Sequence, residues 1–234
     1  MEEHENSKDI FKVVQRCVEI LHFLHLKMDA DECKNYLSGI LFYKYLSDSF
    51  LIRAYELLFD EKPEDMNVAM DTYCKALEDD DTAEALKEEL KRKYRYIIEP
   101  DLTYTSIAEA ARNGAFNREC LQMAFNNIEQ SDTIFTDIFN DVDLYSDLLG
   151  NGGQRQTYAI ASLIKEIDNV DLLNSDDELI SDFFGYLIHI FASGTGKSAG
   201  EFYTPQAVSE IMTRIAICGQ EEKKGLSVYD EAVA

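Results

Sequence analysis

The sequence predicts a mainly α-helical fold. We expect a helical bundle over residues 1–192, a Gly/Ser linker over 193–200 and the beginning of a second domain over 201–234. Apolar residues recur with helical spacing, the chain has three prolines and no tryptophan, and 46% of its residues are hydrophobic, which suffices for a packed core. A length of 234 residues suits one large domain, or one domain with part of another.

Two helices are expected at the start, over residues 10–28 and about 30–58. Asp29 and Glu32 have the pattern of a capping box, in which Asp29 accepts from the Glu32 amide. The second helix is apolar on nearly all sides, so most of it should be buried. The short link predicts that the pair packs antiparallel. The apolar face of the first helix consists of Ile10, Val13, Val14, Cys17, Leu21, Leu24 and Met28.

Shorter helices should follow, separated by recognisable breaks. Glu99-Pro100 ends one of them, Gly114 follows another, and Asn117 is an N-cap. Between residues 131 and 155 the helical pattern is lost among Asp, Asn and Gly. The expected segments are 63–81, 82–96, 106–112, 117–130, 155–167 and 176–192.

The net charge of −23 excludes strong binding of nucleic acid by this chain alone, because such a surface repels a phosphate backbone. Three explanations remain open: solubility, a basic partner, or a place beside DNA where other chains supply the cations. A cytoplasmic protein is expected, since five scattered cysteines form no CxxC pair and the N-terminus is acidic. No apolar run approaches the ~18 residues that span a bilayer, so no membrane contact is expected.

Residues 193–205, SGTGKSAGEFYTP, contain two motifs. GTGKS resembles a phosphate-binding loop, but such a loop needs a Gly five residues before Gly196, where this chain has Phe191. The loop should also follow a strand, whereas residues 187–191 have the pattern of a helix end. We therefore interpret the first half as a flexible linker.

The second motif is a helix start, with Thr204 as N-cap and Pro205 at the first helical position. The free amides there suit an anion, and Phe202 and Tyr203 add flat walls. This combination suits a zwitterionic cofactor that carries a ring, although an ordinary capped helix remains the simpler interpretation. The helix itself should present an apolar face and end at Gly219; that face consists of Val208, Ile211, Met212 and Ile215.

Four stretches give the chain a family resemblance over about residues 20–230. They are LSGILFYKYLSDSF (37–50), DIFNDVDLYSDLLG (137–150), YLIHIFA (186–192) and GEFYTPQ (200–206). The first is similar to the family helix "LGLIFLKYLSDSF", and the last is the most specific. Through them the chain resembles the modification (M) subunits of bacterial type I restriction–modification systems, which are N6-adenine DNA methyltransferases that use S-adenosylmethionine.

The resemblance implies a site, partners and a role. One side of the cofactor pocket would consist of Glu201, Phe202, Tyr203, Thr204, Pro205 and Gln206, and Asp230 would stand at the end of the first strand of the methyltransferase sheet, 225–230. The specificity subunit and the restriction subunit would be partners, with duplex DNA bound in the assembled complex. No metal is implied.

The sequence departs from the family pattern at two places. Phe184-Gly185-Tyr186 stands where the family has Tyr-Glu-Tyr, and Asp230 is followed by Glu-Ala-Val-Ala instead of the glycine turn of Asp-Pro-x-x-Gly-Ser-Gly. No Asn-Pro-Pro-Tyr or Asn-Pro-Pro-Phe, the motif that holds the flipped adenine, occurs in the 234 residues. We therefore assign no catalytic residue and expect the N-terminal portion of such a subunit, with an incomplete α/β domain, inactive alone. The alternative is a stand-alone helical interaction module without catalysis.

Three further candidates have simpler interpretations. His22 and His25 form an i,i+3 pair near Cys17 with no carboxylate in register, and such an open pair without a fixed third ligand is a weak metal candidate. The basic run 87–95 is interleaved with glutamates and should be a self-paired, solvated face rather than a DNA contact. The aromatic residues of 36–50 should lie in the core rather than form a stacking platform for bases.

Overall fold

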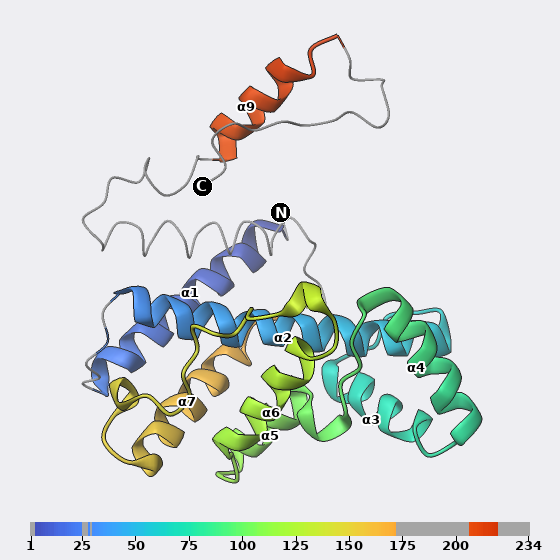
Figure 1. The fold of residues 1–234 in the computed structure, drawn as a ribbon, viewed down its shortest axis with the longest axis horizontal. Coiled ribbons are helices and arrows are strands. Elements are labelled where there is room, and N and C mark those ends of the chain that lie inside the picture. The colour runs from blue at the N-terminus through green and yellow to red at the C-terminus, as the bar shows by residue number, and fades with distance from the viewer. Residues whose placement is uncertain (1–2, 25–27, 29, 172–205, 220–234) are drawn as a thin grey trace. The chain divides into compact units, whose positions relative to one another are not determined.

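All regular structure in the described part of the chain is helical. The computed structural model describes residues 3–24, 28, 30–171 and 206–219 (Figure 1). The chain divides into two units, Met1–Phe191 and Ala192–Ala234. The described residues contain no strand, which confirms the prediction of a mainly helical protein. The expected helix 176–192 and the expected strand 225–230 lie outside the described residues.

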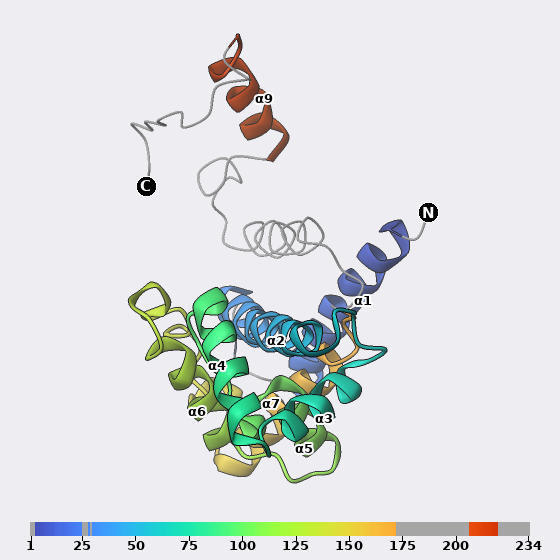
Figure 2. The same cartoon turned by 90° about the vertical axis from the view of Figure 1, so that its right-hand side faces the viewer.

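The first unit is organised around one long helix, α2 (Ala30–Phe59). Figures 1 and 2 show the shorter helices of the unit gathered along it. The aromatic residues of 36–50 belong to the core, as predicted: Tyr36, Tyr43 and Phe50 are at most 3% exposed, and Phe42 and Tyr45 are partly buried against them. No described helix is long and apolar enough to cross a bilayer. The length and apolar character of α2 thus make it the framework for the rest.

Helix α1 (Glu3–Phe23) begins earlier and ends earlier than predicted. Its predicted apolar face is confirmed where side chains are described, because Val13, Val14, Cys17 and Leu21 are all buried. The helix runs back along α2 at an incline and contacts α7 (Gly153–Ile167) more extensively than α2. The sequence link between α1 and α2 could not indicate this contact, because α7 is far away along the chain. Asp29, the expected cap of α2, lies outside the described residues.

Local caps fix the next two helices. Asp65 accepts hydrogen bonds from the amides of Asn67 (2.8 Å) and Val68 (2.9 Å) at the start of α3 (Met66–Ala76). Asp79 accepts from Thr82 N at 2.9 Å and starts α4 (Asp80–Tyr94). These side chains satisfy amides that have no partner within the helix.

The connection after α4 turns the chain back toward α2. A 3-10 turn, η1 (Pro100–Leu102), leads into α5 (Tyr104–Arg112). Asn117 then caps α6 (Arg118–Glu129), as predicted, by accepting from Glu119 N at 3.0 Å.

Residues 131–152 contain little helix yet contribute to the core. Their short 3-10 turns are η2 (Thr133–Phe135) and η3 (Asp147–Leu149). The Phe139 ring stacks on Phe125, with 4.2 Å between ring centroids. Val142 lies so close to Gly39 of α2 that an added Cβ would be 2.4 Å from Val142 Cγ2. A glycine in α2 therefore lets this segment approach the helix backbone.

Buried tyrosine hydroxyl groups connect α2 and its neighbours. Tyr43 donates to the Leu102 carbonyl (2.5 Å), and Tyr96 donates to that of Leu46 (3.0 Å). Tyr104 donates to the carbonyl of Ile164 in α7 at 2.8 Å. Each bond joins segments more than 45 residues apart and satisfies a hydroxyl that would otherwise be costly to bury.

Candidate functional site

The predicted cofactor segment leads into helix α9 (Gln206–Ala216). Gln206 is the first residue of α9, as expected if Thr204-Pro205 precedes a helix. The helix is followed by Gly219 in a left-handed conformation (φ 76°). Glu201, Phe202, Tyr203, Thr204, Pro205 and Asp230 lie outside the described residues.

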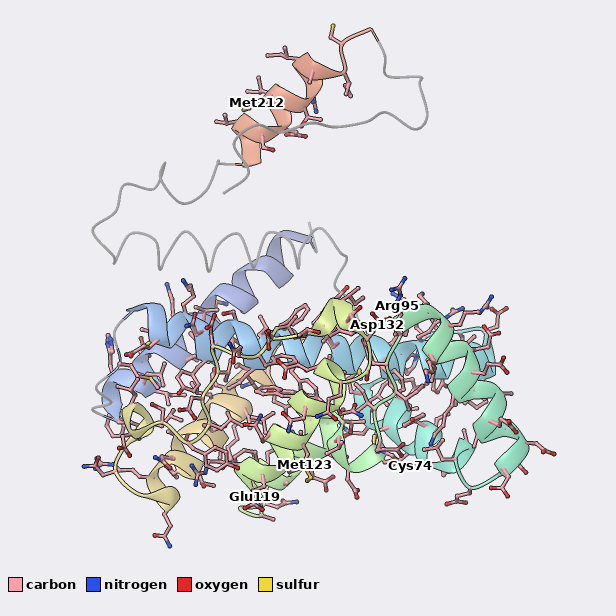
Figure 3. The ribbon with its side chains drawn as sticks, viewed as in Figure 1. Cys74, Arg95, Glu119, Met123, Asp132 and Met212 are labelled. Atoms are coloured by element: carbon pink, nitrogen blue, oxygen red, sulfur yellow. The ribbon has the colours of Figure 1, made fainter. Side chains whose placement is uncertain are left out.

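Helix α9 presents its predicted apolar face, and this face is exposed. Val208, Ile211, Met212 and Ile215 have exposed fractions of 45–70%. Figure 3 labels Met212 on this helix. The helix also carries an ion pair between Arg214 and Glu210 at 3.3 Å. An apolar stripe opposite charged residues is the pattern of a helix that packs on another element.

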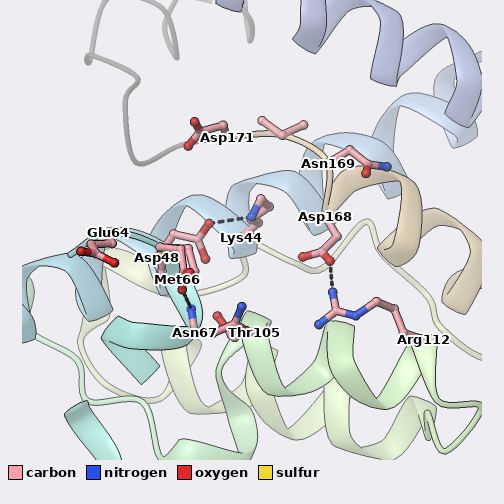
Figure 4. Close-up of a pocket in the computed structure, with 12 residues that line it drawn as sticks. Lys44, Asp48, Glu64, Met66, Asn67, Thr105, Arg112, Asp168, Asn169 and Asp171 are labelled. Carbon is pink, nitrogen blue, oxygen red and sulfur yellow. Dashed lines mark hydrogen bonds and ion pairs between the residues drawn. The ribbon is translucent and has the colours of Figure 1, made fainter. Parts of the chain in front are cut away.

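A polar cavity of about 570 Å³ lies in the first unit beside α2 (Figure 4). Its wall combines α2, the start of α3, α5 and the residues that follow α7. Five carboxylates and two basic groups line it. The charged residues are Asp48, Glu64, Asp65, Asp168 and Asp171 on the acidic side, and Lys44 and Arg112 on the basic side.

The most buried part of this wall is an ion pair within α2. Lys44 Nζ donates to Asp48 Oδ2 at 2.6 Å, and the two side chains are only 4% and 1% exposed. The ammonium group also lies 4.8 Å from the centroid of the Tyr104 ring. Burial raises the pKa of Asp48, whereas Lys44 lowers it and the nearby Asp168 and Asp171 raise it further. Burial thus disfavours the charged form of Asp48, and the ammonium group of Lys44 opposes this effect.

One oxygen of Asp48 has no hydrogen-bond partner among the described residues. Asp48 Oδ1 exposes less than 1 Å² and accepts no hydrogen bond, in contrast to Oδ2. Figure 4 shows the carboxylate pointing toward the side of the cavity formed by Lys44 and Asp168. A buried carboxylate oxygen without a donor is unfavourable and uncommon in folded proteins.

The other charged groups of the wall are largely engaged. Arg112 forms an ion pair with Asp168 across the ends of α5 and α7. Asp65 is occupied as the cap of α3. The two basic groups of the cavity thus each have an acidic partner, and the wall as a whole carries an excess of negative charge.

Sequence reasoning missed this cavity. The available signal was the Lys44–Asp48 pair, which stands at i,i+4 inside a helix that is otherwise apolar on nearly all sides. Charged residues in such a helix are rarely buried unless they are paired. The other wall residues come from segments far apart in the chain, and no sequence pattern connects them.

Three of the five basic residues of the run 87–95 form ion pairs and only one of these pairs lies within the run, so the prediction of a self-paired face is confirmed only in part. Lys87 pairs with Glu99 at 3.4 Å, and Arg95 pairs with Asp132 at 3.5 Å (Figure 3). Arg92 pairs with Glu89 at i,i+3. Acidic partners outside the run thus neutralise part of its positive charge.

Cys17 and His22, two residues of the metal candidate rejected above, differ in their exposure to solvent. Cys17 is fully buried. Its burial, and to a smaller extent the negative charge of the nearby Glu166, raises the pKa of the thiol to about 12. His22 is exposed, and His25 lies outside the described residues. In the described ranges no group of three or more His, Cys, Asp or Glu side chains is placed to hold a metal ion.

Comparison with known families gives two matches in sequence order. The family described as HsdM N-terminal domain matches residues 17–167. The family described as N-6 DNA Methylase matches residues 175–234. The first match covers most of the helices described above.

Individual relatives agree with these matches. The chain is 27% identical to the type I restriction enzyme MpnII methylase subunit of Mycoplasma pneumoniae, over 94% of this chain and 42% of the relative. It is 37% identical, with a TM-score of 0.84, to the crystal structure of the type I restriction-modification system methyltransferase subunit from Streptococcus thermophilus. That comparison covers 94% of this chain and 46% of the solved one. The chain thus spans less than half the length of these relatives.

Proposed function

This chain belongs to the HsdM N-terminal domain family of type I restriction–modification methylase subunits, and from that premise we propose that it serves as the N-terminal part of an N6-adenine DNA methyltransferase in the cytoplasm. In this proposal residues 1–192 form the assembly domain beside DNA, 193–200 are a linker, and 201–234 begin the domain that binds S-adenosylmethionine.

One observation carries the proposal. The family match over residues 17–167 coincides with the helices that pack around α2, so the similarity concerns a whole folded unit rather than an isolated motif. The likeness to the Streptococcus thermophilus subunit extends over 94% of the chain, and the second family match, over residues 175–234, includes α9. A stand-alone interaction module would not require the second match, over residues 175–234.

We assign cofactor binding to the segment that leads into α9. Glu201 to Gln206 would form one wall of the pocket, with the methionine end of S-adenosylmethionine facing the Thr204-Pro205 turn, because free amides at a helix start favour a carboxylate. The apolar face of α9 would pack on the remainder of a methyltransferase sheet. S-adenosylmethionine supplies the methyl group when bound; the residues of this chain would hold and orient it. Asp230 would lie at the end of the first strand.

We predict that the 234-residue chain alone binds S-adenosylmethionine at millimolar strength or not at all. The reason is that a pocket with one wall loses most of the buried area from which a small ligand gains affinity. Isothermal titration calorimetry checks this prediction. ATP is the control ligand, and it should not bind either, since Phe191 stands where a phosphate loop needs Gly. Micromolar binding of S-adenosylmethionine would mean that residues of this chain complete the pocket.

We also predict that the chain alone does not bind duplex DNA at physiological salt but does so together with a specificity subunit. The net charge of −23 leaves the contact with phosphates to other chains. A gel-shift assay with the chain, the specificity subunit and both together makes the comparison. Sub-micromolar, salt-sensitive binding by the purified chain alone would contradict the assignment of partners.

A further inference from the structure

A groove of about 350 Å³ lies along α7 and shares no wall residue with the cavity beside α2. Its other side is formed by the end of α5 and the turn before α6, from Ala111 to Arg118. We call it the α7 groove, and from residue 153 to residue 165 it follows about 18 Å of helix, or about three turns. On α7 it is lined by one stripe of residues, which are Gln154, Thr157, Tyr158, Ala161 and Lys165.

The floor of the α7 groove is apolar. Ala111 and Phe116 are 1% and 8% exposed, and Ala161 packs against the hydrophobic core. Tyr158 lines the same groove but is 62% exposed. A large aromatic side chain that stays exposed beside an apolar surface is typical of an anchor for a binding partner. The length and the apolar floor of the groove suit a helix that carries an apolar stripe.

The charged side chains that line the α7 groove are both basic, and they are Arg118 and Lys165. Arg118 Nη1 donates to the carbonyl of Leu144 (3.0 Å) and to Gln156 Oε1 (2.6 Å), which fixes the guanidinium group without neutralising it. Lys165 forms no ion pair with any residue that the structure describes. In a chain with 45 acidic and 22 basic residues, such a lining distinguishes this groove and favours an acidic ligand.

The two cations lie at opposite ends of the groove. An added Cβ on Gly153, the first residue of α7, would be 3.1 Å from Arg118 Nη2, so Arg118 lies at the start of the helix. Lys165 is in its last turn. A partner helix of about three turns can therefore place one carboxylate near each cation while its apolar stripe covers the floor between them.

Two other occupants fit the groove less well. A second copy of the chain that docked groove to groove would bring Arg118 and Lys165 close to the same cations of its partner. A phosphate backbone matches the cations, but it has no apolar surface to cover Phe116 and Tyr158, and the net charge of −23 repels it. An acidic amphipathic helix matches both the floor and the two ends.

We propose that the α7 groove docks an acidic amphipathic helix of a partner protein. Phe116, Tyr158 and Ala161 contact its apolar stripe, and Arg118 and Lys165 each meet a carboxylate. This contact belongs to the helical unit alone. It involves neither the predicted cofactor segment nor methyl transfer, so its test is separate from the tests of the proposed function.

Fluorescence anisotropy of the whole chain with three labelled peptides tests the proposal. The first peptide has leucines at helical spacing on one face and glutamates on the other. The second replaces the glutamates by lysines, and the third has the composition of the first with leucines and glutamates alternating. We expect saturable binding of the first peptide at one site, and binding of the other two to be weaker by about tenfold or more.

The charge of the chain makes this comparison stringent. The net charge of −23 attracts the basic peptide, so a preference for the acidic one must come from the groove. Absence of saturable binding by the first peptide, or tighter binding of the second, would overturn the proposal.

Competition separates a protein partner from the other occupants. Excess unlabelled acidic peptide should displace the labelled peptide, and duplex DNA at physiological salt should not. Displacement by DNA would overturn the proposal and assign the groove to a phosphate backbone. Self-association of the chain that the acidic peptide reverses would likewise overturn it, in favour of a second copy.

Matched variants locate the binding site. Tyr158→Ala should weaken binding of the acidic peptide by about tenfold or more, whereas Met123→Ala, which truncates a similarly exposed side chain on α6, should not. Lys165→Gln should weaken binding by about two- to threefold, and Lys91→Gln, the same loss of charge on α4, should not. All four positions are exposed, so the variants should keep native circular dichroism. Equal affinities in all four would mean that the peptide binds elsewhere and would refute the proposal.

Discussion

Leu41→Asp is expected to unfold the helical unit. Leu41 lies in the middle of α2, it is 5% exposed, and it belongs to the core that α2 shares with its neighbours. An aspartate there would bury a charge without a partner, which costs several kcal/mol. Since a domain of this kind has a total stability of only about 5–15 kcal/mol, such a loss is decisive. The measurement is urea unfolding followed by far-UV circular dichroism.

Met123→Asp is the matched control for this substitution. Met123 is 54% exposed on α6, so the same carboxylate would remain in water there (Figure 3). We expect its unfolding free energy to stay within about 0.5 kcal/mol of the original protein. If Leu41→Asp unfolded at the same urea concentration as this control, the central position of α2 in the core would be wrong.

Lys44→Met should destabilise the unit by about 3–5 kcal/mol, because it leaves Asp48 buried without its cation. The size of the effect should depend on pH. Burial raises the pKa of Asp48 even in the presence of Lys44, and loss of Lys44 removes an opposing influence. The penalty is therefore present above the folded-state pKa and is relieved as the pH falls through it, when the folded protein takes up a proton. Urea unfolding at pH 8 and pH 5 measures the difference.

The double variant Lys44→Met/Asp48→Leu completes this comparison. Replacing a buried ion pair by apolar side chains of similar volume is often neutral or stabilising, in contrast to breaking it. We expect the double variant to regain most of the stability that Lys44→Met loses, with no added dependence on pH. A double variant as unstable as the single one would show that the shape of the pair matters more than its charge.

Much of the helical unit could be predicted from the sequence because its signals are local. The periodic apolar face of α1, the all-round apolar character of α2 and the Asn117 cap each depend on residues a few positions apart. The contact of α1 with α7 and the burial of Phe139 and Val142 could not be predicted in this way. They depend on which distant segments meet, and the approach of Val142 to Gly39 needs a glycine that looks like a weak point in a helix.

The two candidate sites also differ in how far their residues lie apart along the chain. The segment from Glu201 to Gln206 is a contiguous motif, so sequence alone suggests a role for it, and this assignment stays a prediction. The cavity around Asp48 joins four separate stretches of chain. Its only sequence signal is the charged pair in α2, and even that pair does not indicate that Arg112 and Asp168 lie nearby.

The tyrosines buried between helices set an alkaline limit to the fold. Burial raises the pKa of Tyr36 to about 12 and raises those of Tyr43, Tyr73, Tyr96 and Tyr104 as well. An unfolded chain releases these phenolic protons near pH 10, whereas the folded chain retains them. Each upward step in pH beyond that point therefore favours the unfolded state at several positions at once. The same hydroxyl groups that join the helices at neutral pH would make the unit unfold cooperatively in strong base. Phenolate absorbance would appear together with unfolding.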